Sequence, residues 1–298
     1  MYGLILFIPL ISCIVAGLFG RSIGEKGAGL FTSICIVITF FICAFAFVEI
    51  TFFNAPNYLH LWTWMDTGNF TVSFSLLFDQ LTAVMLVVVT SVSCLVHIYS
   101  IEYMNGDPHL PRFMSYLSLF TFFMLILITA NNILLLFIGW EGVGLCSYLL
   151  ITFWYTRLQA NKSAIKAMIV NRVGDAALVL GMCLIYYSYN SLDYNVIFAL
   201  APYLVNDTIS ILNFEFYTIN AIGVLLLLGA AGKSAQLFLH TWLPDAMEAP
   251  TPVSALIHAA TMVNLLPSYQ RNLIDNYFAV CENLLISYEY TLLLNNES

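Results

Sequence analysis

This sequence is built from long apolar runs that contain few charges. Residues 81–96, LTAVMLVVVTSVSCLV, would be predominantly apolar on every side of a helix. A membrane-spanning β-strand would instead alternate apolar and polar residues over about ten positions. An α-helix needs about 20 apolar residues to cross about 30 Å of hydrocarbon. We therefore expect an all-α, polytopic transmembrane bundle.

The composition excludes several classes of soluble protein. Of the 298 residues, 61% are hydrophobic and only 9% are charged, against about 45–50% and about 25% in ordinary soluble domains. The nine Lys and Arg residues are too few and too scattered to form a nucleic-acid-binding patch. The seven cysteines lie singly without a CxxC pair, so neither a zinc site nor a disulfide framework is predicted. We expect no metal and no cofactor in this chain.

The placement of the basic residues supports a count of about eight spans. Six Lys and Arg residues fall in the connections after the first, third and fifth spans, and none falls in those after the second, fourth and sixth. Because basic loops stay on the inner side of a membrane, this pattern places the N-terminus on the outer side. The spans are expected near residues 3–20, 29–53, 80–101, 112–130, 132–154, 164–188, 217–240 and 251–267.

Two longer connections are polar enough to lie outside the hydrocarbon. Residues 54–79 contain two Trp residues, a His and a Pro, which is typical of an interfacial segment with aromatic anchors. Residues 189–216 mix Asn, Asp, Tyr and Leu, and we expect a short surface helix there. No basic residue precedes the first apolar run, so it is interpreted as a span rather than a cleaved signal peptide.

Ionisable residues inside the expected spans are the candidate functional groups, because a charge that faces lipid is costly. Glu141 lies in the fifth span, Lys233 in the seventh and His258 in the eighth. A lone carboxylate and a lone ammonium are both unfavourable there unless they are paired or hydrated. A lysine beside a charge that comes and goes can load and release a proton, which is the chemistry of a proton relay. For His258 alone, a hydrogen-bonded core histidine is the alternative.

Three further features surround these groups. Arg172 and Asp175 lie three positions apart in the sixth span and share one helix face, so a self-contained ion pair between them is the structural alternative. His240 lies at the inner end of the seventh span, where it can exchange protons with water. Gly229 and Gly232 precede the buried lysine and permit a helix break beside a wet cavity. Simple helix packing is the alternative explanation of these glycines.

Three long stretches carry a family resemblance. They are SIEYMNGDPHLPRFMSYLSLF, FIGWEGVGLCSYLLITFWYTRLQANKSAIKAMIVNRVGD and GKSAQLFLHTWLPDAMEAPTPVSALIHAATMV. They resemble subunit 5 of mitochondrial NADH dehydrogenase, respiratory complex I, and the related antiporter-like subunits. FDQL at residues 78–81 also fits this pattern and makes Asp79 an expected structural acid. The resemblance covers about residues 1–263 and implies the first half of an inverted-repeat fold, with three N-terminal spans in residues 1–111, the first antiporter-like repeat in 112–267 and a divergent tail in 268–298.

The resemblance also implies roles for individual residues. Glu141 matches the family's fifth-span glutamate, which sets the charge state of the seventh-span lysine, here Lys233. His258 matches a histidine that passes protons along a hydrated central axis. Arg172 and Asp175 match a charged pair near the input side, where they support the relay.

The resemblance implies a membrane-arm subunit that translocates protons within an H⁺-translocating NADH:ubiquinone reductase of the inner mitochondrial membrane. We expect no redox centre in the chain, with FMN, iron–sulfur clusters and ubiquinone elsewhere in the complex. Its expected partners are the other membrane-arm subunits and membrane lipids. The alternatives are a subunit of a multisubunit cation/proton antiporter, a structural or assembly remnant, and a haem-binding bundle, for which the histidines provide no paired-ligand context.

Residues 264–298 show no match to the family pattern, and the second half of the inverted repeat does not follow residue 263. We expect a split subunit, in which a separate polypeptide supplies that second half. A truncated reading frame is the alternative. Peptides from residues 270–298 found beside a second-half polypeptide in the purified complex would favour the split.

Overall fold

The computed structural model describes residues 1–256 except for 69, 205–206, 212–213 and 237–238. Within these residues, six helices are long and apolar enough to cross a membrane, and they confirm the first six expected spans. The helices are α1 (Tyr2–Ile23), α2 (Glu25–Phe53), α3 (Gln80–Tyr103), α4 (Leu110–Thr129), α5 (Ile133–Ile151) and α6 (Leu158–Tyr189).

The chain after α6 forms shorter helices. An apolar helix of 16 residues, α8 (Thr218–Lys233), takes the place of the seventh expected span and ends seven positions before the predicted boundary at 240. Two short elements follow, α9 (Trp242–Asp245) and the 3₁₀ helix η2 (Ala246–Glu248). The eighth expected span begins with α10 (Thr251–Ala255), and most of it lies outside the described residues.

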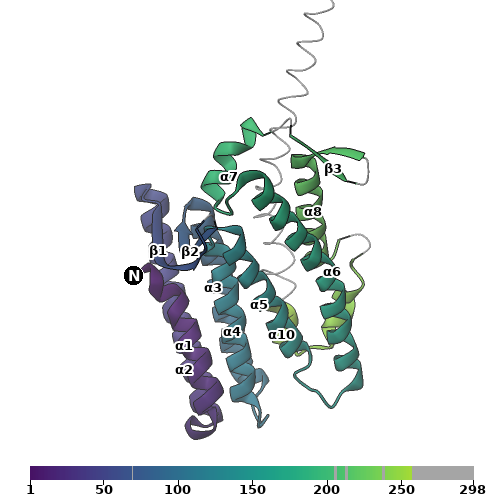
Figure 1. Ribbon diagram of the computed structural model, residues 1–298. Helices are drawn as coiled ribbons and strands as arrows, with labels where there is room; N and C mark the ends of the chain where they lie inside the picture. The colour runs from purple at the N-terminus through teal and green to yellow at the C-terminus, as the bar shows by residue number, and fades with distance from the viewer. Residues whose placement is uncertain (69, 205–206, 212–213, 237–238, 257–298) are drawn as a thin grey trace, which may run out of the picture.

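The helices pack side by side around α4 and α5 (Figure 1). α4 lies against α1, α3 and α5, and α6 lies against α5 and α8. The side chains of α4 are mostly buried, whereas α1 and α2 keep large apolar side chains such as Leu18, Phe41 and Phe52 exposed. In a bilayer, such apolar faces contact lipid tails or neighbouring helices without a hydrophobic penalty.

Two β-hairpins occupy the connections, a feature that the sequence reasoning did not predict. The segment expected to be interfacial forms the first hairpin, where Trp62 stacks on Phe74 with ring centroids 4.6 Å apart. Aromatic and β-branched residues favour a pleated, half-buried surface, and this segment is rich in them. The hairpins therefore lie between the helices and leave the helical class of the bundle unchanged. They pair β1 (Asn57–Asp66) with β2 (Thr71–Phe78), and β3 (Thr208–Ile211) with β4 (Phe214–Tyr217), both antiparallel.

The expected short surface helix is present as α7 (Tyr194–Leu200), followed by the 3₁₀ turn η1 (Ala201–Tyr203). Figure 1 shows α7 and both hairpins toward one end of the bundle, and the α1–α2, α3–α4 and α5–α6 connections at the other. The basic residues of the three latter connections therefore share one end, as the alternating charge pattern predicted. They are Arg21, Lys26, Arg112, Arg157, Lys162 and Lys166.

Asp79 has the structural place expected for it, at the N-terminus of α3. Its carboxylate accepts a hydrogen bond from the Thr82 amide at 2.8 Å, and the Thr82 hydroxyl accepts one from the Asp79 amide at 2.8 Å. This reciprocal capping box satisfies two amides that the helix leaves without partners.

Asp193 directly precedes α7, and it should make the local stability of α7 depend on pH. Burial raises the pKa of the Asp193 carboxyl above its ordinary value, so folding favours the protonated form and local stability falls as the pH rises above about 4. We expect Asp193→Asn to increase hydrogen-exchange protection of the α7 amides at pH 7, and this gain to vanish below about pH 4. A gain of equal size at both pH values, after correction for intrinsic exchange rates, would contradict the prediction.

Candidate functional site

Three glycines of the GWEGVG segment determine how α5 packs. A Cβ on Gly139 would lie 2.7 Å from the backbone nitrogen of Leu127 in α4, so this position admits only glycine unless the helices separate. A Cβ on Gly142 would overlap the ring of Phe123, also in α4. A Cβ on Gly144 would instead lie 2.9 Å from Lys233 Nζ. Two of the glycines therefore bring α5 close to α4, and the third leaves room for the lysine.

Small residues also bring α6 and α8 together. A Cβ on Gly174 of α6 would lie 3.2 Å from the Gly229 carbonyl oxygen and 3.3 Å from the Gly232 Cα, both in α8. Glycines permit this close approach of two backbones in a membrane. The approach places Asp175, the residue after Gly174, at the same level as the C-terminal end of α8.

The predicted helix break lies directly after Lys233. α8 ends at this residue, and Ala235 adopts a left-handed φ of 50°, which is strained for a residue with a Cβ. The Trp242 indole N–H donates to the Gly232 carbonyl at 3.1 Å and so satisfies a group near the helix end. Gly229 and Gly232 therefore pack against α6 and also precede the helix end, and neither is among the residues that line the pocket between α5 and α6.

Lys233 is buried between the helices, with 1% of its surface exposed. Its Nζ donates a hydrogen bond to the Trp140 carbonyl oxygen at 2.6 Å. The same nitrogen lies 5.1 Å from the centre of the Trp140 ring, within the range of a cation–π interaction. The Asp175 and Glu141 carboxylates are close enough to act on its charge.

Trp140 connects Lys233 to Asp175, a role that the sequence reasoning missed. The fully buried indole donates its N–H to Asp175 Oδ1 at 2.6 Å, while the carbonyl of the same residue accepts from Lys233. A signal was available, because a buried Trp N–H normally needs a polar partner and Trp140 directly precedes the candidate glutamate. Lys233 thus contacts the backbone carbonyl of Trp140, and Asp175 contacts its indole N–H.

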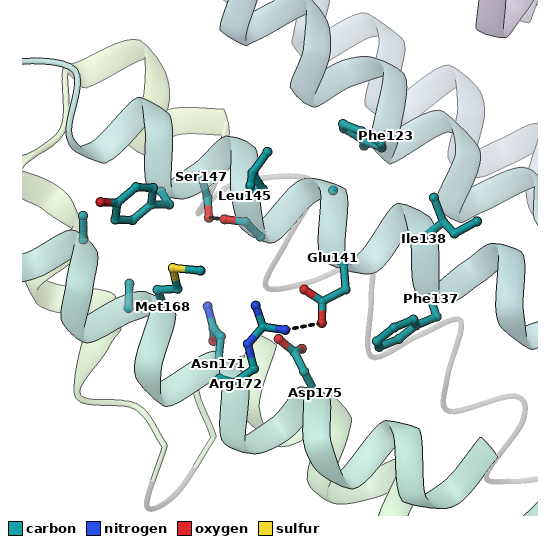
Figure 2. A pocket seen from close by; sticks show the side chains of 15 residues that line it. Phe123, Phe137, Ile138, Glu141, Leu145, Ser147, Met168, Asn171, Arg172 and Asp175 are labelled. Carbon is teal, nitrogen blue, oxygen red and sulfur yellow. Dashed lines mark hydrogen bonds and ion pairs between the residues drawn. The ribbon is translucent and has the colours of Figure 1, made fainter. Parts of the chain in front are cut away.

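Arg172 pairs with Glu141, so the structural alternative of a self-contained ion pair between Arg172 and Asp175 does not hold. Arg172 Nη1 lies 2.7 Å from Glu141 Oε1, and Figure 2 shows this contact across the space between α5 and α6. Asp175 is instead buried against Trp140. A spacing of three residues places two side chains on one helix face, but the neighbouring helix decides which partner each one meets. The Arg172 side chain is 56% exposed and that of Glu141 29%, so this ion pair is accessible from outside the chain.

A pocket of about 390 Å³ lies between α5 and α6 at this ion pair (Figure 2). Glu141, Asn171, Arg172 and Asp175 supply most of its polar lining, and Phe123, Phe137 and Met168 contribute apolar walls. The Asn171 side-chain oxygen is buried and has no hydrogen-bond partner among the described residues. A water molecule needs about 10–15 Å³ and two to four polar partners. The pocket is large enough for several, and the polar groups around the ion pair provide partners for those nearest to it.

The histidines differ in position. His240 is exposed in the connection between α8 and α9. His258 lies outside the described residues. His97 is fully buried between α3 and α4, where Nδ1 lies 2.8 Å from the Ser93 carbonyl and Nε2 lies 3.4 Å from the Ser118 hydroxyl. Polar partners on two helices account for His97 as a core residue.

Two family models match the chain. The model for the transmembrane region of NADH:quinone oxidoreductase and Mrp antiporters matches residues 130–277, and the model for the N-terminus of complex I chain 5 matches residues 64–114. The first of these contains Glu141, Lys233 and the pocket between α5 and α6. The chain therefore belongs to the antiporter-like family of multi-pass membrane subunits.

Within this family, the chain is similar to chain 5 of NADH-ubiquinone oxidoreductase. It is 58% identical to that of Chondrus crispus over 263 residues, covering 88% of this chain and 40% of the relative, and 58% identical to that of Metridium senile, covering 88% and 42%. The match to Podospora anserina is 50% identical and covers 99% of this chain and 42% of the relative, so the similarity continues past residue 263, where the sequence analysis expected it to end. The chain thus spans about two-fifths of the length of these relatives.

Solved structures share the fold. The Mrp complex from Dietzia sp. matches with a TM-score of 0.73 at 27% identity, covering 89% of this chain and 27% of that chain. The membrane-bound sulfane sulfur reductase, an archaeal respiratory membrane complex, matches with a TM-score of 0.77 at 20% identity, covering 95% of this chain and 56% of that one. Both belong to multisubunit membrane complexes, and the second match supports the fold alone.

Proposed function

We propose that this chain is a proton-translocating membrane-arm subunit of respiratory complex I in the inner mitochondrial membrane, with its N-terminus on the intermembrane-space side. The observation that carries the proposal is the position of Lys233. This cation is buried at the end of a broken helix, bonded to Trp140 and near two carboxylates. Ionisable residues inside membrane spans are rare and mark ion or proton pathways, so a buried lysine of this kind supports a functional role.

The contacts support a switch in which Glu141 changes partner. While Arg172 holds Glu141 at 2.7 Å, much of the carboxylate charge is neutralised. When the ion pair opens, the Glu141 charge favours the protonated form of Lys233. When the Arg172–Glu141 ion pair closes, the Glu141 charge no longer favours protonated Lys233, and Lys233 releases its proton. Water in the pocket between α5 and α6 is the proposed medium for the exchange, since the polar lining includes both Glu141 and Asp175.

Asp175 keeps a fixed role in this proposal. Its hydrogen bond from the Trp140 indole holds the carboxylate in place and provides a constant negative charge near Lys233. The switch then depends on the more exposed Glu141 and Arg172. We propose His258 and His240 as later stations toward water. The resemblance implies this role for His258, and the position of His240 after the end of α8 suggests it for that residue.

The rest of the complex supplies the energy in this proposal. Quinone chemistry elsewhere, with FMN, iron–sulfur clusters and ubiquinone, drives the opening of the Arg172–Glu141 pair through neighbouring membrane-arm subunits. The separate polypeptide that completes the subunit stays a prediction, which mass spectrometry of the purified complex tests.

Glu141→Ala tests the switch. We expect the variant complex to assemble, because Arg172 lines the pocket between α5 and α6, where water can solvate it once its partner is removed. Coupled proton translocation per NADH oxidised, measured in proteoliposomes, should be lost because no charge remains to alternate beside Lys233. Glu102→Ala on the exposed end of α3 is the matched control and should pump normally. Wild-type stoichiometry in the assembled Glu141 variant would contradict the proposal.

A cation/proton antiporter outside complex I is less well supported. The Mrp match is 27% identical, whereas the chain 5 relatives are 50–58% identical over at least 263 residues. Copurification separates the two possibilities, since a complex I subunit should be isolated with flavin- and iron–sulfur-containing subunits. A structural remnant would show wild-type pumping in the Glu141 variant.

A further inference from the structure

A second pocket, of about 990 Å³, lies at the basic end of the bundle, away from Lys233. It is formed where the α1–α2 turn meets the connection between α3 and α4. Its ionisable lining consists of three cationic side chains, one histidine and one carboxylate, so its net charge is positive. These residues are Arg21, Lys26, Arg112, His109 and Glu25.

The cations of this pocket have unused hydrogen-bonding capacity. Neither Arg21 nor Lys26 forms an ion pair within the described part of the chain, and both are exposed. Arg112 donates through Nη2 to the Phe153 carbonyl at 3.2 Å, but its Nε is buried without a partner among the described residues. A guanidinium donor without a partner favours an anionic acceptor such as a phosphate oxygen.

The surroundings of the pocket are apolar and exposed. Leu18 and Phe19 lie less than one turn before Arg21 on α1, with 75% and 57% of their surfaces exposed. A soluble anion gains nothing from such a surface, whereas the acyl chains of a lipid pack against it. Basic pockets between transmembrane helices on the inner side of a membrane bind anionic lipid headgroups in this way.

We propose that this pocket binds the phosphate headgroup of an anionic phospholipid from the leaflet on the basic side of the bundle. Arg21 and Lys26 contact the phosphate oxygens, and the Arg112 guanidinium adds positive charge at the pocket wall. The acyl chains extend along the exposed face of α1. This inference does not depend on the proton relay, and its readout is lipid binding rather than pumping.

Photocrosslinking in the native complex tests the site. The complex that contains this chain is placed in phosphatidylcholine nanodiscs with a trace of photoreactive phosphatidylglycerol, and labelling of the peptide across the α1–α2 turn is measured by mass spectrometry. The Arg21→Gln/Lys26→Gln double variant should show about 25-fold less labelling, since each basic residue near a membrane surface contributes about fivefold. Lys26→Arg keeps the charge and should retain wild-type labelling.

The controls identify the ligand and its location. Lys162→Gln removes an exposed lysine from the same end of the bundle but outside this pocket, and labelling should stay within about twofold of wild type. Photoreactive phosphatidylcholine should label the turn weakly and equally in all variants. The proposal is overturned if the double variant labels like wild type, if phosphatidylcholine labels as well as phosphatidylglycerol, or if millimolar inorganic phosphate displaces the label.

Discussion

Replacing Lys233 with methionine should abolish coupled proton translocation while the complex still assembles. Lys233 is the one Lys or Arg that is fully buried among the described residues, so its removal leaves the site without a protonatable amine. Methionine fills a similar volume, so the substitution opens no cavity between the helices. Asp175 keeps its hydrogen bond from the Trp140 indole and is not left without a polar partner.

The measurement compares protons moved per NADH oxidised in proteoliposomes, with assembly followed on native gels. Lys162→Met is the matched control, because it removes an exposed lysine from the basic end of α6 and should leave both quantities unchanged. An assembled Lys233→Met complex that pumps with the wild-type stoichiometry would refute the assignment. Per assembled complex, Lys233→Met should reduce pumping more than Gly139→Ala does.

Alanine at Gly139 and alanine at Gly144 should affect different properties, although the two glycines lie in the same helix. The first should reduce assembly, and the second should reduce proton translocation. At Gly139 the new methyl group meets the backbone of Leu127 at 2.7–2.8 Å, and a backbone cannot move aside. Overpacking of this kind costs about 1–3 kcal/mol, partly offset by the roughly 1 kcal/mol that alanine gains over glycine in a helix. We therefore expect Gly139→Ala to reduce the amount of assembled chain.

At Gly144 the methyl group meets only the flexible end of Lys233, at 2.9 Å from Nζ. The bundle should persist, while the ammonium is displaced from the Trp140 carbonyl. Since a hydrogen bond to a charged group contributes about 1.5–3 kcal/mol, we expect proton translocation to fall by about tenfold or more. Native gels and pumping assays on the two variants form one experiment. Equal loss of assembly in both, or normal pumping in Gly144→Ala, would contradict the packing described here.

The sequence predicted the helices and the buried charges because both are local signals. A charge inside a 20-residue apolar run identifies Glu141 and Lys233 directly, and glycines before the lysine indicate a helix break. The partner of Arg172 was not predictable in this way, since it depends on how α6 is rotated against α5. Trp140 was missed because its carbonyl, and not only its side chain, takes part in the site. The hairpins were missed because aromatic residues in a polar connection are equally typical of an irregular interfacial segment.

Trp140 also gives the site a spectroscopic consequence. Its indole is bonded to Asp175 and lies 5.1 Å from the Lys233 ammonium, so the ring experiences the electric field of both groups. Indole absorption and emission shift when such a field changes. Each gain or loss of a proton at the lysine should therefore alter the fluorescence of one tryptophan, which makes this residue an intrinsic optical reporter of turnover.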